Sequence, residues 1–113
     1  MSIYHDLSLV SVEFSADRRE LIMQGNGLQT KASLIFRNVA TWALSPFETQ
    51  NVIFDVVRYD AATGSKELFE DYDVPDYHRE MVLREQFFLF ELQASVGMGG
   101  YIIAKELIVQ QHT

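Results

Sequence analysis

A chain of 113 residues has the length of one domain, and a hydrophobic content of 48% is typical of a folded globular protein. Nine Lys and Arg against sixteen Asp and Glu give a net charge of −7, which disfavours nucleic acid and anionic membranes as partners. The absence of cysteine excludes disulfides, thiolate metal ligands and a cysteine nucleophile. We therefore expect a single domain over residues 1–113, and the segments below indicate that it is β-rich.

The N-terminal residues Met1–Asp6 lack the basic segment and apolar run of a signal peptide. No apolar stretch approaches the roughly 20 residues that span a bilayer. The absence of cysteine also fits a reducing compartment. We therefore expect a cytoplasmic protein without a membrane partner.

Alternation of apolar and polar residues predicts strands through the first half of the chain. Leu7–Phe14 alternates, with Val10, Val12 and Phe14 on one face, and Glu20–Gln24 returns after a short polar loop. A period of two with one apolar face is typical of a half-buried strand. The two segments therefore predict a first hairpin.

Three further segments extend the pattern. Leu28–Phe36 alternates over a long stretch. Val39–Leu44 predicts a short strand, with a helix over Asn38–Leu44 as the alternative, and either element ends before Pro46. Gln50–Tyr59 is apolar on both sides, with Val52, Phe54 and Val56 expected on one face. Because both faces need cover, this segment predicts a central strand.

Lys66–Glu85 is the least regular segment. Asp76 is a candidate helix cap, with Tyr77 and Met81 following at a spacing of i, i+4. The alternation from Met81 to Arg84 equally fits the start of the next strand. We predict one or two short helices here.

The last part of the chain predicts the centre of the sheet. Two runs rich in aromatic and β-branched residues, Phe87–Leu92 and Tyr101–Val109, flank the glycine-rich segment Ser95–Gly100. Glycine readily adopts positive φ, so these segments predict an antiparallel hairpin. The adjacent Phe87 and Phe88 place one ring on each face, so both faces must be covered.

These segments together predict a mainly β fold. We expect an antiparallel β-sandwich or small barrel of six to seven strands, with an α+β variant carrying one or two helices between Lys66 and Glu85 as the alternative. A strand left uncapped at the sheet edge would favour a homodimer. Dimerisation therefore stays open.

The three histidines do not match a known catalytic or metal-binding pattern. His5 and Asp6 are adjacent, but neighbours on a strand point to opposite faces, so we expect them to shape the turn before the first strand. His78 and His112 fit no metal-ligand spacing, and we expect solvated or capping roles. We assign no catalytic residue, no metal site and no cofactor.

The glycine-rich segment Ser95–Gly100 matches neither of the common phosphate-binding loops, and strand-like residues follow it. We interpret it as a turn. The alternative is a small ligand-binding protein or enzyme with a pocket near this turn, using at least two of His5, Asp6 and His78.

An acidic run occupies the irregular segment, but its spacing does not match a calcium-binding loop. Two interpretations remain: a solvated acidic face, and a docking surface for a basic protein. The candidate partner-binding residues are Glu67, Glu70, Asp71, Asp73 and Asp76.

The opening His5–Phe14, the Arg18–Arg19 turn and the segment Leu34–Val39 resemble the start of small bacterial domains. Some of these domains are predicted immunity proteins of polymorphic toxin systems. The resemblance covers about the first third of the chain and implies a β-rich, non-enzymatic protein that binds and blocks a toxin. No catalytic or binding residue carries over from it.

We therefore expect a cytoplasmic bacterial protein-binding module without catalysis, of immunity type in its more specific form. A self-associating structural subunit is a further alternative.

Overall fold

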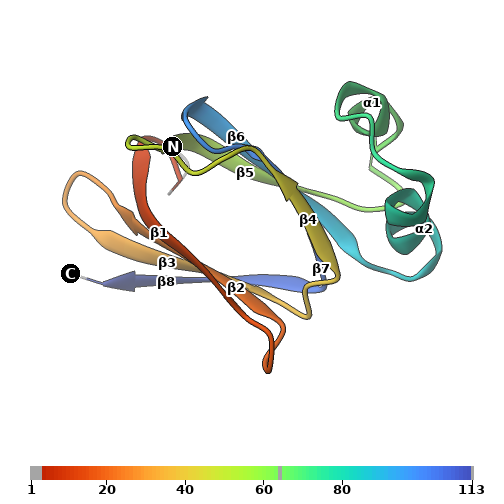
Figure 1. Cartoon of the computed structure of the whole chain (residues 1–113), viewed down its shortest axis with the longest axis horizontal. Helices are drawn as coiled ribbons and strands as arrows, with labels where there is room; N and C mark the ends of the chain where they lie inside the picture. Colours follow the sequence, from red (N-terminus) through yellow and green to blue (C-terminus); the bar gives the residue numbers. More distant parts are fainter. Residues whose placement is uncertain (1–3, 64, 113) are drawn as a thin grey trace.

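The computed structural model describes residues 4–63 and 65–112, in which eight β-strands and two short α-helices form (Figure 1). In chain order the elements are β1 (Leu7–Ser15), β2 (Glu20–Asn26), β3 (Lys31–Arg37), β4 (Thr41–Leu44), β5 (Val52–Tyr59), α1 (Ser65–Asp71), α2 (Asp76–Arg84), β6 (Phe88–Val96), β7 (Gly100–Ala104) and β8 (Glu106–His112). The prediction of a mainly β fold with one or two short helices between Lys66 and Glu85 is confirmed, since two helices form there. Neither described helix is long and apolar enough to cross a membrane.

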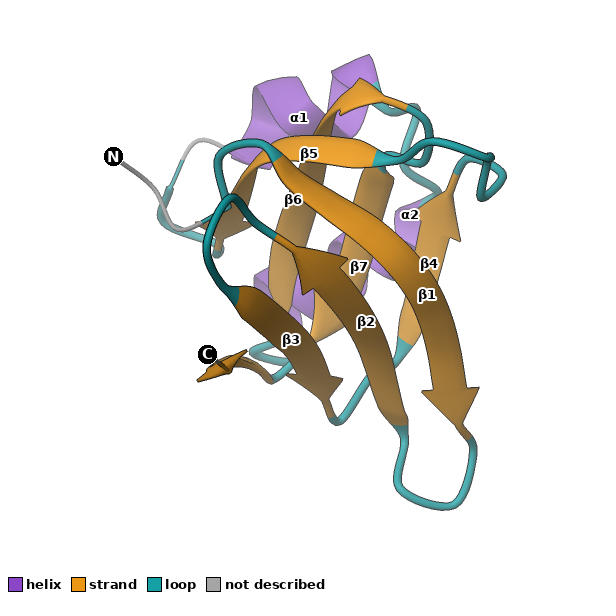
Figure 2. Cartoon of the chain, turned by 90° about the vertical axis from the view of Figure 1, so that its left-hand side faces the viewer, coloured by secondary structure: helices purple, strands orange, loops and turns teal. Residues whose placement is uncertain are grey.

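All eight strands belong to one antiparallel sheet in the order β4-β7-β6-β5-β1-β2-β3-β8, and the sheet does not close into a barrel. Its two halves, β1-β2-β3-β8 and β4-β7-β6-β5, face each other across a shared core (Figures 1 and 2). A short pairing of β1 with β5 joins them, where Leu7 lies opposite Ile53. The result is a sandwich made by folding one sheet.

The sheet order is symmetric about the β1–β5 contact. In the sheet order, strands β1, β2, β3 and β4 correspond to strands β5, β6, β7 and β8, respectively. The fourth strands are exchanged, since β4 pairs with β7 and β8 pairs with β3. The registers of these two outer pairs also correspond. Phe36 on β3 lies opposite Leu107 on β8, and Ile102 at the matching place on β7 lies opposite Trp42 on β4. This two-fold relation is a property of the topology, because the sequence shows no internal repeat.

Bulges at equivalent places in β1 and β5 turn two apolar side chains outward. Val10 and Phe54 are the residues skipped in the two registers, and they are 54% and 48% exposed. A bulge shifts the alternation of a strand by one residue. The predicted common face of Val10 with Val12, and of Phe54 with Val56, is therefore wrong.

The predicted C-terminal hairpin is confirmed in its first part only. β6 pairs with β7, but Lys105 interrupts the run Tyr101–Val109, and β8 pairs with β3 instead. Two backbone hydrogen bonds join this bend to the neighbouring segment that runs from the end of β3 to β4. Lys105 N donates to Arg37 O (3.0 Å), and Ala40 N donates to Ile103 O (2.8 Å). Because this run is divided, the described chain has eight strands rather than six to seven.

Strands β6 and β7 separate two hydrophobic cores. The inner core lies between the halves of the sheet, where the rings of Phe36 and Phe90 are 5.5 Å apart. The outer core lies between the helices and the sheet, and contains Leu68, Phe69, Val74, Val82, Leu89, Tyr101 and Ile103. Phe87 packs against the outer core and Phe88 against the inner one, as predicted.

Candidate functional site

The five acidic residues predicted to bind a partner lie on the helical insertion, which we define as residues 65–85 between β5 and β6. They are Glu67, Glu70 and Asp71 on α1, Asp73 in the connection and Asp76 at the start of α2. All five are exposed, and among the described residues none of them forms an ion pair. Asp76 does not cap α2 as predicted, because the N-cap position is Pro75.

Basic side chains offset little of this charge at the surface. The helical insertion contains seven acidic and three basic residues. Arg79 turns back on its own segment, and its Nε donates to Val74 O at 2.7 Å. Arg84 pairs with Glu80 on the same helix at 2.8 Å. The helical insertion therefore presents a negative surface to solvent.

A carboxylate on the sheet anchors the helical insertion. Tyr72, which directly follows α1, donates its hydroxyl to Glu91 on β6 at 2.6 Å, and Tyr59 donates to the same carboxylate at 3.4 Å. Gln93 Nε2 donates to it at 2.8 Å. Burial and the Glu91 carboxylate raise the pKa of both tyrosines, so both hydroxyls remain protonated donors. The outer core and this network together hold the acidic surface in place.

His78 lies on the buried face of α2, with 5% of its surface exposed. Its Nδ1 lies 2.8 Å from the Tyr101 hydroxyl, and its Nε2 has no hydrogen-bond partner among the described residues. Burial lowers the pKa of His78 and raises that of Tyr101, so both groups are held neutral. The predicted solvated or capping role is wrong for His78. The sequence signal was its i, i+4 spacing to Val82, the other buried residue of α2.

The other histidines lie elsewhere in the fold. The turn before β1 brings His5 Nε2 to 3.4 Å from Asp6 Oδ2, against the divergence expected of adjacent strand residues. The two side chains are 44% and 73% exposed, so the contact contributes little to stability. His112 is exposed, with Nε2 3.2 Å from Ser33 Oγ. The described residues contain no group of three His, Asp or Glu side chains arranged to hold a metal ion.

The glycine-rich segment forms the predicted turn between β6 and β7, with Gly97 at a φ of +82°. The buried Asn51 holds the turn, because its Oδ1 accepts from Met98 N at 3.0 Å and from Glu48 N at 2.9 Å. A Cβ at Gly97 would lie 2.8 Å from Asn51 Cα. Four surface pockets of the described chain contain no residue from Ser95–Gly100. The turn is thus packed against its own chain.

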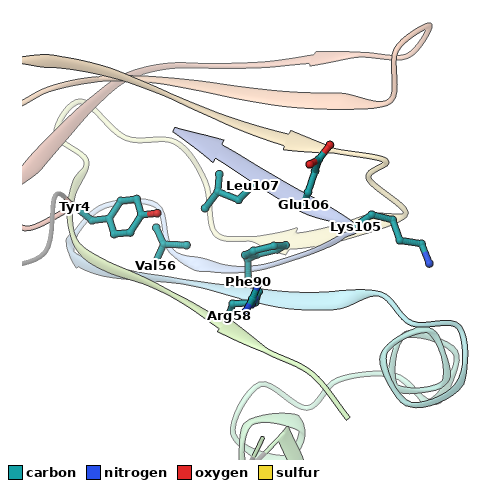
Figure 3. A pocket seen from close by; sticks show the side chains of 7 residues that line it. All are labelled: Tyr4, Val56, Arg58, Phe90, Lys105, Glu106 and Leu107. Atoms are coloured by element: carbon teal, nitrogen blue, oxygen red, sulfur yellow. The ribbon is translucent and has the colours of Figure 1, made fainter. Parts of the chain in front are cut away.

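One of these pockets is a cleft of about 430 Å³ between β5, β6 and β8 (Figure 3). Its lining residues are Tyr4, Val56, Arg58, Phe90, Lys105, Glu106 and Leu107. Arg58 lies 4.7 Å from the centre of the Phe88 ring, and Lys105 Nζ donates to Glu85 O at 2.7 Å. Figure 3 shows Lys105 and Glu106 pointing away from the Phe90 ring. The cleft is therefore not a convergent catalytic site.

Two groups of polar side chains thus differ. Tyr72 and Glu91 form a hydrogen bond with each other, as do His78 and Tyr101, whereas Glu67, Glu70, Asp71, Asp73 and Asp76 face solvent without ionic partners. Comparison of the chain with protein-family models, with curated proteins and with solved structures found no match.

Proposed function

We propose that the protein is a protein-binding module without catalytic activity, and that its helical insertion binds a basic protein partner. The observation that carries this proposal is the set of exposed carboxylates without ionic partners at Glu67, Glu70, Asp71, Asp73 and Asp76. A surface held in place before binding loses less conformational entropy on association. The Tyr72–Glu91 hydrogen bond and the outer core supply that support.

Electrostatics favours a basic protein over other partners. The chain carries a net charge of −7, and the helical insertion concentrates part of it on one exposed segment. Opposite charges across an interface accelerate association and exclude acidic competitors. Binding should therefore weaken as salt screens the charges.

The more specific form of the proposal is an immunity-type protein of the bacterial cytoplasm that binds and blocks a toxin. The resemblance of His5–Phe14 and Leu34–Val39 to predicted immunity-protein domains supports it. Co-expression with a toxin encoded by a neighbouring gene would test this form. Restored growth of the host is the expected result, and unchanged toxicity would contradict it.

Two matched triple variants test the role of the helical insertion. One carries Glu67→Gln, Glu70→Gln and Asp73→Asn, and the control carries Glu13→Gln, Asp17→Asn and Glu48→Gln at exposed positions outside the helical insertion. Both sets remove three negative charges, so they differ only in location.

Co-purification from the native host would identify a basic partner, and calorimetry with that purified partner would give the affinities. We expect the first variant to bind about tenfold or more weakly and the control to retain its affinity. Equal losses in the two variants would contradict a role for the helical insertion. A pure protein that binds no basic partner but turns over a small molecule would overturn the whole proposal.

A further inference from the structure

β8 is the less protected of the two sheet edges. It pairs with β3 over seven residues without a bulge, and in the described part of the chain no strand pairs with its other side. Its stretch Leu107–Gln111 contains no charge, proline or glycine. Soluble proteins protect such edges with short strands, charges, prolines or bulges. β8 has none of these within that stretch.

The equivalent edge strand in the other half is protected. β4 has only four residues, and Pro46 follows it at a distance of two residues. Proline supplies no backbone donor and ends strand pairing. The two edges occupy the same place in the symmetric sheet order, so the difference lies in their sequences.

A row of isoleucines leads to the open edge. Ile22, Ile35 and Ile108 are neighbours across β2, β3 and β8, and all three are partly exposed. Their strand neighbours on either side point into the inner core, so the row lies on the outer face. The helices pack on the other half of the sheet, so they do not cover this row.

We propose that β8 pairs antiparallel with β8 of a second copy of the chain, about a two-fold axis at Ile108. Ile108 then lies beside Ile108 of the partner subunit, and the isoleucine row continues across both sheets. Leu107 lies beside Val109 of the partner subunit on the inner face. A second copy of the chain is favoured over a strand of a different protein, because the second copy presents the same uncharged edge and extends the same row of isoleucines.

The surroundings of β8 are compatible with this pairing. The helical insertion lies at the opposite end of the longest axis from the C-terminal end of β8 (Figure 1). Its negative charge is screened over a Debye length of about 10 Å at 0.1 M salt. The cleft of Figure 3 opens beside β8 and is lined there by Glu106 and Leu107, so it leaves space next to this edge.

Sedimentation of the full chain and two matched variants tests the proposal. Ile108→Lys places a charge on the β8 edge, and Ala43→Lys does so at the equivalent position of β4. We expect a dimer of the unmodified chain, about tenfold or more weakening of the dimer in Ile108→Lys, and no change in Ala43→Lys. A strictly monomeric chain, or a dimer sensitive only to Ala43→Lys, would overturn the proposal.

Cross-linking tests the register without a destabilising charge. The chain lacks cysteine, so Ile108→Cys introduces a single thiol. Paired residues of antiparallel strands lie within disulfide range, so mild oxidation should give a covalent dimer. Ile35→Cys, one strand away on the same face, is the control and should stay uncross-linked. Equal cross-linking of both variants, or none of Ile108→Cys, would overturn the Ile108 axis. The two triple variants that neutralise acidic residues should leave the dimer intact. The test of the dimer and the test of the proposed function can therefore fail independently.

Discussion

The two halves of the sheet share their strand order and register but differ on their outer faces. In the half with β6 and β7, the outward side chains Leu89, Tyr101 and Ile103 are at most 2% exposed beneath the helices. In the other half, Ile22 and Ile35 on the corresponding face remain partly exposed. The register places Ile35 opposite Ile108 where Tyr101 lies opposite Ala43. One insertion between β5 and β6 thus converts an open face into a second core.

The strongest test of this comparison removes the same atoms from both faces. Ile103→Ala, at a fully buried site under the helices, should lower the free energy of unfolding by about 2–5 kcal/mol. Ile35→Ala, at a partly exposed site, should cost about 1 kcal/mol, because less apolar surface leaves contact. Urea unfolding at a concentration where the chain is monomeric measures both values. Equal losses would contradict the distinction between the two faces.

A second test addresses how the helices are held on the covered face. Tyr72→Phe keeps the ring but removes its hydrogen bond to the Glu91 carboxylate, and should cost about 1.5–2 kcal/mol. Hydrogen exchange should accelerate most in α1. The control Tyr77→Phe changes a 64% exposed tyrosine and should stay within about 0.5 kcal/mol of the unmodified chain. A similar loss in both variants would show that the Glu91 anchor is unimportant.

The third and smallest effect is a pH dependence that arises on the covered face. Burial lowers the pKa of folded His78 below the unfolded value of about 6.5, so the unfolded chain binds the proton more readily. The free energy of unfolding should therefore fall as the pH drops below about 6.5, by at most about 1.4 kcal/mol per pH unit from this group. The contribution of neutral His78 is fully present above that pH.

His78→Gln should remove this part of the pH slope, whereas His112→Gln, at an exposed site, should preserve it. Unfolding curves between pH 7 and pH 5 give the slopes. An unchanged slope in His78→Gln would show that the buried imidazole does not govern the acid sensitivity of the helices.

Local patterns in the sequence predicted most of the elements. Alternating apolar residues located the strands, and Gly97 marked a turn that needs a positive φ. The exposure of the acidic residues was predictable too, because carboxylates are rarely buried without partners. Their lack of ionic partners was not, because it depends on how Arg79 turns back to Val74.

The incorrect predictions concern residues whose position depends on contacts with distant parts of the chain. Val10 and Phe54 look like inward residues, but the pairing strands skip them and turn them outward. Tyr101–Val109 reads as one strand, yet its halves pair with different neighbours on either side of Lys105. His78 looks solvated by its polarity, although Tyr101, 23 residues away, forms a hydrogen bond with it.

The order of apolar residues, turn residues and charges by itself determined a mainly β domain with an exposed acidic segment, and indicated one or two short helices. These are local properties, set by side-chain alternation, backbone preference and the cost of burying charge. Only the tertiary structure decided the exchange of β4 and β8, the second core and the unprotected β8 edge. Those features arise from pairings between strands far apart in the chain, and many pairings are compatible with the same local pattern.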